Sequence, residues 1–566
     1  MVRYIFNPTG RRATPARNKT FKFSAKLFVP EHTRDGSGKS LDELYSIDFE
    51  NDVIEEGSKS VIYRCVHKES GEERAVKIVA KSSSNEDENA RIRQEIELLK
   101  KMDHPNIVRV FSTFEDNKHF CIVMEYCKCG ELRHQIIGGT SLSEFYVAVM
   151  IKTILSTINY CYQKHQVVHL GLKPENILLD STVSVEQLKL IDFGNSIQAP
   201  TATKAERLIG SAAYLAPESL QYHSYSHKTD IWAIGCVAFL ALSGHMPFDA
   251  ANDKETLELI INSKNEVERK EIFQGDKWAL VSDDAIDFLS KMLSFEPFKR
   301  PSAKEALQHP WIQRVTQAQI EVVQKRDISL AKSAIDNLFS LQAPSKLQQA
   351  ALTYIASQCL SKFDKSEMER IYQALDLNGL GKLSKEDVQK AHAKYMEDEA
   401  DIKKLTKGEL KELFAQVDFL GNGFIEYSEF LVGALPVDRL LTEENMLKAF
   451  QHFDHDKDGE ISAEDLKHVL GALLPKADTT SLNLDKYIHE KVLRQVETGA
   501  EGTITYDVFV DLLLESKSGP GRNPHRRQSA QFTSEEFRMA NAVDRMSISG
   551  NVFDQSRFVF ERNLKV

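Results

Sequence analysis

The feature that most constrains the fold of this 566-residue chain is a helix-loop-helix unit that repeats four times beyond Lys365. Twelve-residue loops begin at Asp376, Asp418, Asp454 and Glu497, and apolar residues at helical spacing flank them. In such a loop, oxygen atoms at positions 1, 3, 5, 9 and 12 and the carbonyl at position 7 coordinate calcium, while glycine at position 6 makes the bend. The repeat therefore predicts an all-α region with calcium-type loops over residues 366–515.

The third loop, residues 454–465, has the most complete set of ligands. Its candidate ligands are Asp454, Asp456, Asp458, the carbonyl of Glu460, Ser462 and Asp465. The twelfth residue is Asp where Glu is usual, and the shorter side chain reaches an ion less readily with both oxygens. We therefore expect this loop to bind calcium, with weakened affinity or with competition by magnesium.

The other three loops lack ligands. The second, residues 418–429, keeps Asp418, Asn422, the carbonyl of Phe424, Glu426 and Glu429, but has Leu420 at position 3. The first, residues 376–387, keeps Asp376, Asn378, Ser384 and Asp387, but has Leu380 at position 5. We expect both to bind calcium weakly or not at all. In the fourth, residues 497–508, Gly499 and Val508 replace ligands, so it is predicted to be structural, with Ile504 in a short strand that pairs two loops.

A series of short motifs runs through the first half of the chain. A strand pattern holds Ala75-Val76-Lys77, the helical run 91–102 holds Glu95, and residues 122–126 form another strand pattern. Beyond them come His169–Asn176, Asp192-Phe193-Gly194, Ala216-Pro217-Glu218, Asp230, Arg300 and His309–Ile312. A single such match is weak evidence, but several in one order at consistent spacing make coincidence implausible.

These motifs resemble those of protein kinases over roughly residues 47–314. The repeated units beyond them resemble calmodulin-like EF-hands, so the whole chain is similar to the calcium-dependent protein kinases of plants and protists. The resemblance implies an α+β architecture, in which a bilobal protein-kinase fold precedes an all-α calmodulin-like domain of four EF-hands. In that family, calcium reorganises the sensor and a junction helix and so releases an inhibited kinase.

The resemblance also implies a site for ATP and Mg²⁺. Lys77 would hold the α and β phosphates and pair with Glu95, while Asn176 and Asp192 would bind the metal. Lys173 would help to position the reactants. Further nucleotide contacts would come from Ile54, Gly57, Ile62, Met124 as the gatekeeper, and Glu125.

The catalytic loop departs from the family pattern His-Arg-Asp-Leu-x-x-x-Asn. His169, Leu172 and Asn176 match it, but Leu170 replaces Arg and Gly171 replaces the Asp that accepts the proton of the substrate hydroxyl. In the phosphate-covering loop, Glu55 and Ser60 replace two of the three glycines, and only Gly57 is kept. Backbone amides approach phosphates most closely at glycine, so both changes disfavour an efficient enzyme.

Three functions follow from these residues. The preferred hypothesis is a pseudokinase, a calcium-responsive scaffold or regulator that binds ATP without turning it over usefully. The alternative is a slow but active Ser/Thr protein kinase, because general-base catalysis is worth only about a hundredfold to ten-thousandfold. The third is a structural adaptor that binds neither ligand.

The remaining segments set the predicted boundaries and partners. We expect a basic disordered tail over residues 1–46, a helical junction over 315–365 and a flexible C-terminal tail over 516–566. The tail up to residue 40 has nine Lys or Arg against two Asp or Glu, so weak contact with an anionic membrane or partner is an alternative to plain solvation. No apolar run is long enough for a membrane helix. The expectation is a cytoplasmic protein with protein partners or substrates and no nucleic acid.

Overall fold

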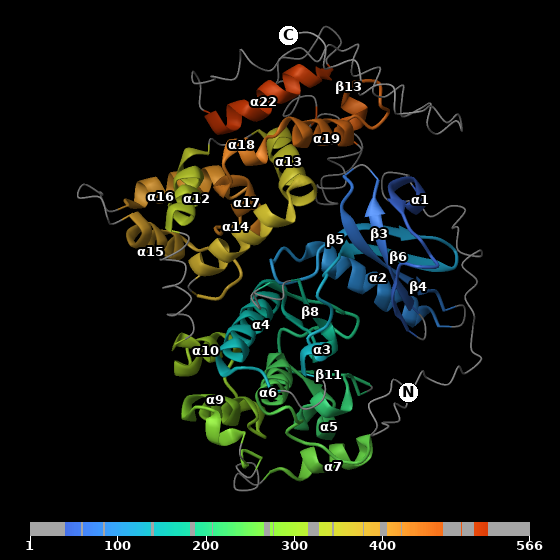
Figure 1. Cartoon of the computed structure of the whole chain (residues 1–566), viewed down its shortest axis with the longest axis vertical. Helices are drawn as coiled ribbons and strands as arrows, with labels where there is room; N and C mark the ends of the chain where they lie inside the picture. The colour runs from blue at the N-terminus through green and yellow to red at the C-terminus, as the bar shows by residue number, and fades with distance from the viewer. Residues whose placement is uncertain are drawn as a thin grey trace, which may run out of the picture.

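The computed structural model in Figure 1 describes residues 40–518 with gaps. The gaps are residues 58–59, 69, 83–84, 137–140, 181–186, 207, 265–271, 276, 315–327, 342–344, 377, 397–404, 420, 468–487 and 489–502. The predicted tails lie almost wholly outside the described residues, and so do residues 315–327 and 342–344 of the junction and residues 497–502 of the fourth calcium-type loop. Among the described helices, none is both long enough and apolar enough to cross a membrane.

An antiparallel sheet and one long helix form the N-terminal lobe. The strands are β1 (Tyr45–Ser46), β2 (Val53–Glu56), β3 (Ser60–His67), β4 (Glu73–Ala80), β5 (Val110–Glu115) and β6 (His119–Glu125). Their order is β1-β3-β4-β6-β5, with β2 paired to β3. The strand patterns predicted at Ala75-Val76-Lys77 and at residues 122–126 are confirmed by β4 and β6. Helix α2 (Glu86–Lys101) begins at the N-cap Asn85, whose side chain accepts from the Glu88 amide.

Regular structure begins earlier than the expected boundary at Ile47. A short helix, α1 (Leu41–Leu44), starts at Ser40, which forms a capping box with Glu43. Leu41 and Tyr45 are buried against the sheet, and Tyr45 pairs with His67 in β3. From the sequence, this segment is expected to belong to the basic tail, because the residues around it show no clear helical or strand periodicity.

The C-terminal lobe is mostly helical. Its helices are α3 (Arg133–Ile136), α4 (Glu144–His165), α5 (Pro217–Tyr222), α6 (His227–Ser243), α7 (Asp253–Asn262), α9 (Asp283–Met292) and α10 (Ala303–Leu307). Short strand pairs complete it: β7 (Val167–Val168) with β10 (Ile197–Gln198), β8 (Ile177–Leu179) with β9 (Leu188–Leu190), and β11 (Thr203–Lys204) with β12 (Ser224–Tyr225). Helices α4 and α6 are buried over most of their length and form the core of the lobe.

Helices and loops alternate beyond residue 328. The elements are α12 (Ile328–Ser340), α13 (Lys346–Tyr354), a π-helical turn (Ile355–Cys359), α14 (Lys362–Leu375), α15 (Lys385–Met396), α16 (Lys407–Val417), α17 (Tyr427–Ala434), α18 (Val437–Leu440), α19 (Glu443–Phe453), β13 (Glu460–Ile461), β14 (Ile504–Thr505) and α22 (Tyr506–Ser518). We call residues 362–518 the EF-hand region. The expected α+β lobes followed by an all-α region are therefore confirmed.

The junction helices belong to the core of the EF-hand region. Ile335, Leu338, Leu347 and Leu352 from α12 and α13 are buried in one hydrophobic cluster with residues of α14, α17 and α19. This packing explains the apolar residues at helical spacing in the junction. Figure 1 shows these helices on one side of the two lobes, with α14 near β5 and α4.

Candidate functional site

Lys77 and Glu95 meet between the sheet and helix α2. The Nζ atom of Lys77 lies 3.5 Å from Oε1 of Glu95, and both side chains are largely buried. Burial alone would lower the pKa of Lys77, but the carboxylates of Glu95 and Asp192 outweigh it and raise the pKa. The ammonium group is therefore held charged, as a phosphate ligand requires.

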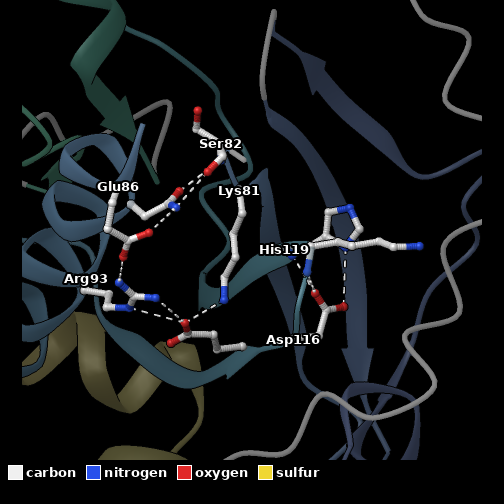
Figure 2. A network of polar contacts seen from close by, with 9 residues as sticks. Lys81, Ser82, Glu86, Arg93, Asp116 and His119 are labelled. Carbon is white, nitrogen blue, oxygen red and sulfur yellow. Dashed lines mark hydrogen bonds and ion pairs between the residues drawn. The ribbon is translucent and has the colours of Figure 1, made fainter. Parts of the chain in front are cut away.

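A network of charges fixes the helix that carries Glu95. Figure 2 shows Arg93 of α2 between Glu86 and a carboxylate at the end of β5. The Arg93 guanidinium donates to Glu86 and to Glu115 at 2.8 Å each, and Lys81 after β4 lies 2.7 Å from the same Glu115 oxygen. These contacts join α2 to two strands of the sheet. Glu95 lies two residues after Arg93 in the same helix and faces Lys77.

Asn176 and Asp192 come together on the floor of the site. The Asn176 amide nitrogen donates to the Gly171 carbonyl at 2.7 Å and lies 3.5 Å from Oδ2 of Asp192. Because its nitrogen is used in this way, the amide oxygen of Asn176 is the atom left to bind a cation. A carboxylate and an amide oxygen are suitable ligands for Mg²⁺, so the pair fits the metal that the resemblance implies.

Gly194, two residues after Asp192, allows this arrangement. A Cβ atom on Gly194 would lie 3.0 Å from Oε2 of Glu95 and 3.2 Å from Oδ1 of Asp192. Asp192 itself has a φ of 63°, which few non-glycine residues adopt. The backbone at this point is therefore shaped to bring Asp192 and Glu95 close to Lys77.

Gly171 borders a small cavity of about 40 Å³ in the catalytic loop. Lys173, Asn176, Asp192, Ser211 and Tyr214 are among the residues that line this cavity. No side chain projects into it from position 171. A Cβ atom at position 171 would lie 3.2 Å from Nδ1 of His169 and 3.4 Å from Nδ2 of Asn176. A larger residue could therefore be accommodated if the side chains of His169 and Asn176 moved slightly.

Asp230 supports the catalytic loop from α6. Its two carboxylate oxygens accept the backbone amides of His169 at 2.7 Å and Leu170 at 2.9 Å. Burial raises the pKa of Asp230 to about 7, although these amides oppose the effect. Burial also lowers the pKa of His169 to about 4, so the imidazole is neutral.

Leu170 is held in a left-handed conformation, with a φ of 59°. Its side chain is buried in a cluster with Val168, Ala199 and Tyr225. The two amide hydrogen bonds to Asp230 hold the loop in this uncommon conformation. Leu170 stands where the family pattern has an arginine, so the side chain at this position packs in an apolar cluster.

The predicted nucleotide contacts lie on several elements. Ile54 is exposed on β2, Ile62 is half-buried on β3, and the Gly57 amide donates to the Ser60 carbonyl at 2.8 Å. Met124 at the end of β6 packs against Val79, Phe120 and Ile122. Glu125 follows it, but its side chain lies 3.2 Å from Nζ of Lys189, a partner that the sequence did not indicate.

The third calcium-type loop gathers three carboxylates. One oxygen from each of Asp454, Asp456 and Asp458 lies within 4.8 Å of the others, a spacing that fits a divalent cation. Burial raises the pKa of Asp454 to about 6, although the Gly459 amide donates to it at 2.9 Å. The predicted Glu460 follows in β13, and the buried Asp465 accepts from Ser462 and His455.

The pairing of the last two loops is confirmed. Ile504 of β14 lies opposite Ile461 of β13 in an antiparallel pair. The β-branched side chains at both positions are fully buried. The third loop is thus supported by the fourth, of which residues 497–502 lie outside the described residues.

In the first two loops, the candidate ligands are already bonded within the protein. Asp376 accepts the amides of Leu380 and Gly381, and Asn378 donates to Asp387 at 2.8 Å. In the second loop, Asp418 accepts the amides of Asn422 and Gly423, and Glu429 accepts the amide of Glu426. The amide of Phe424 donates to the side chain of Asn422, at 2.9 Å.

Two lysines, which no sequence motif indicated, link the lobes to the EF-hand region. Lys189 of β9 lies near Glu369 of α14 as well as Glu125, and Lys164 of α4 lies 2.7 Å from Oε1 of Glu426. A lone lysine in a sequence usually indicates solvated surface charge. The fold brings these partners together although they lie far apart in the sequence.

Comparison with known proteins agrees with this arrangement. The protein kinase domain model matches residues 50–312, and the EF-hand domain pair model matches residues 365–433 and 443–514. Calcium-dependent protein kinase 4 of Plasmodium falciparum is 33% identical over 470 residues, which cover 82% of this chain and 85% of that protein. Calcium-dependent protein kinase 34 of Arabidopsis thaliana is 30% identical over 497 residues, covering 88% and 89%.

These matches extend across both parts of the chain. The kinase domain is the module that uses ATP and Mg²⁺, and EF-hands are the modules that bind Ca²⁺. The same order of modules occurs in the relatives, over most of their length. The chain therefore belongs to the calcium-dependent protein kinase family of Ser/Thr protein kinases.

Proposed function

We propose that this protein is a calcium-responsive pseudokinase, which holds ATP and Mg²⁺ but transfers phosphate poorly. The observation that carries the proposal is Gly171, which offers no side chain to the cavity beside Asn176 and Asp192. A substrate hydroxyl placed there would find no carboxylate from position 171 to orient it or accept its proton. The protein would then act through the surfaces that it presents to partners.

The retained residues support nucleotide binding. Lys77, kept charged beside Glu95, would hold the phosphates, and the oxygens of Asn176 and Asp192 would hold the metal. The metal supplies charge stabilisation of the phosphates when it is bound. The full proposed site also includes Ile54, Gly57, Ile62, Met124 and Glu125, with Lys173 at the edge of the catalytic cavity.

A specific observation favours a second candidate, the slow but active kinase. The ion pair at 3.5 Å and the close approach of Asn176 to Asp192 preserve the groups on which positioning and charge stabilisation depend. Phosphoryl transfer rests mainly on those effects, so transfer at a low rate would be compatible with Gly171. The two candidates differ in rate, not in the ligands bound.

Phosphate transfer from labelled ATP by the purified full-length chain distinguishes them. The assay uses Mg²⁺, with and without calcium, and Asp192→Ala is the control because it removes a proposed metal ligand. We expect no transfer above the control. Calcium-dependent transfer that the control lacks would overturn the pseudokinase proposal and favour the slow kinase.

A direct nucleotide-binding measurement completes the test. A fluorescent ATP analogue with Mg²⁺ should bind the wild-type chain, and Lys77→Met should weaken binding about tenfold or more, because it removes a charged phosphate contact. If neither nucleotide nor calcium changes the melting temperature of the folded chain, the structural adaptor is the better description. Calcium in this measurement is expected to bind the third loop, through Asp454, Asp456, Asp458, the Glu460 carbonyl and Asp465.

A further inference from the structure

The second calcium-type loop contacts a cation supplied by the kinase domain. The Nζ atom of Lys164, in the last turn of α4, lies 2.7 Å from Oε1 of Glu426 at position 9 of that loop. The Asn422 amide donates to the same oxygen at 2.9 Å. The Glu426 side chain is 0% exposed, whereas the lysine side chain is 22% exposed.

The other carboxylate oxygen of Glu426, Oε2, makes no polar contact with the described residues that could share the negative charge. Oε2 is buried and has no hydrogen-bond partner. Lys164 is the cation in direct contact with this carboxylate, and Lys382 of the first loop adds a second positive charge that interacts with Glu426. A buried charge that loses its partner is strongly destabilising, because water cannot replace the contact.

Polar contacts on both sides of Lys164 continue the same interface. The Ser428 amide and hydroxyl donate to Oδ2 of Asp103 at 3.1 and 2.7 Å. Asn159 of α4 donates to the Gly379 carbonyl in the first loop at 2.8 Å. Both degenerate loops therefore use their own atoms to contact the kinase domain.

The glycines of the first loop fit this contact sterically. A Cβ atom on Gly381 would lie 2.4 Å from His104 and 2.8 Å from Tyr160, and one on Gly379 would lie 2.5 Å from Leu307. Both residues have a positive φ as well. The loop that lacks an oxygen ligand at Leu380 is thus closely packed against α4 and α10.

We propose that Lys164 takes the place of calcium in the second loop and holds the first EF-hand pair, residues 365–433, on the kinase domain without the ion. The calcium response then lies in the third loop, where three carboxylates converge. A calcium ion that used the Glu426 carboxylate in the second loop would have to displace Lys164 from it. This inference does not depend on whether the chain transfers phosphate, because it concerns the contact between two parts of the protein.

Hydrogen exchange of the full-length chain tests the proposal directly. Amides of residues 424–431 are to be measured in EGTA and in excess calcium. We expect the wild-type protein to protect them equally in both conditions. Protection that appears only with calcium would overturn the proposal, and this comparison needs no variant.

Substitutions identify the residue responsible. In EGTA, Lys164→Met should speed exchange of residues 424–431 at least about tenfold, since opening of the interface becomes easier. Lys164→Arg should preserve protection, because it keeps a cation near Glu426. The matched control is Lys291→Met, which removes an ion pair of 2.6 Å with Asp287 on α9.

Calcium titration by calorimetry gives an independent reading. We expect the wild-type second loop to take no calcium, so that Glu429→Gln leaves the number of bound ions unchanged. The proposal is wrong if Glu429→Gln abolishes one calcium site. It is also wrong if Lys164→Met and Lys291→Met give the same exchange rates as the wild-type chain.

Discussion

At the scale of single residues, the proposed loss of phosphate transfer depends on Gly171. The backbone around it is intact, because Asp230 holds the amides of His169 and Leu170 and Asn176 donates to the Gly171 carbonyl. Under the proposal, this loop keeps its backbone contacts and lacks the carboxylate at position 171. A single substitution at position 171 could therefore restore the carboxylate.

Gly171→Asp should therefore raise phosphate transfer. The new carboxylate would enter the cavity beside Lys173 and Asn176, and a positioned general base contributes about a hundredfold or more. Because the added Cβ approaches His169 at 3.2 Å, we expect a smaller gain, about tenfold. The measurement is labelled phosphate transfer, with Gly171→Asn as a control of similar size. Equal activity of the two variants would show that the carboxylate is not the missing group.

A second residue-scale prediction concerns calcium. Asp454→Asn should weaken calcium binding to the third loop about tenfold or more, because it removes one negative charge from the ligands and the ligand charge count sets the affinity of such loops. Asp376→Asn in the first loop is the matched control and should leave the affinity of the third loop unchanged, since it alters a loop in which Leu380 stands in place of an oxygen ligand. Calorimetric titration of both variants measures the difference. A loss of affinity in the control alone would contradict the assignment of the ion to the third loop.

At the scale of elements, a buried ion pair fixes the Ala216-Pro217-Glu218 segment to the rest of the C-terminal lobe. Both terminal nitrogens of Arg300 donate to Glu218 at the start of α5, at 2.8 and 2.7 Å. The Arg300 side chain is 0% exposed, and that of Glu218 is 8% exposed. Arg300 also donates to the carbonyls of Ser294 and Phe295, so it joins three segments.

Arg300→Met should destabilise the C-terminal lobe by about 3–5 kcal/mol, because it leaves the Glu218 carboxylate buried without its partner. The double variant Arg300→Met/Glu218→Gln should recover part of this loss, since the amide carries no charge. Urea denaturation, followed through the tryptophan fluorescence of this lobe, measures both. If the double variant were less stable than the single one by the full cost of Glu218→Gln alone, the pair would not be coupled.

Elements and motifs were predictable from the sequence to different degrees. Strands over residues 53–80 and helix α2 followed from local patterns, and Lys77 and Glu95 met as the order of motifs indicated. Helix α1 escaped prediction because four residues carry too little periodicity. The contacts of Lys164 and Lys189 were also missed, since they join residues far apart in the chain, and no local pattern reports such a pairing.

At the scale of the whole molecule, the interface between kinase domain and EF-hand region has a buried histidine at its centre. His104 packs against the ring of Tyr160 at 4.9 Å between centroids and faces Gly381 of the first loop. Its Nδ1 atom accepts the Asn106 amide at 3.0 Å. Asn106 in turn bonds to Gln373 of α14, so the same turn contacts the EF-hand region twice.

This histidine should make the stability of the docked molecule dependent on pH. Burial, assisted by the charges of Lys189 and Lys164, lowers the pKa of His104 from 6.5 to about 3. Below pH 6.5 the imidazole takes up a proton when it is exposed but not when it is buried, so stability falls as the pH falls. Between pH 7.5 and 5.5 this group alone should cost about 1.4 kcal/mol.

The melting temperature of wild type and His104→Asn at these two pH values measures the effect. The wild-type protein should lose about 2–4 °C more than the variant on acidification, because asparagine keeps an acceptor for the Asn106 amide but does not titrate. Comparing the two proteins removes the contribution of other groups, including His165, whose pKa burial lowers to about 4. Parallel losses in both proteins would mean that His104 reaches water before the molecule melts, and that this interface opens ahead of the rest of the fold.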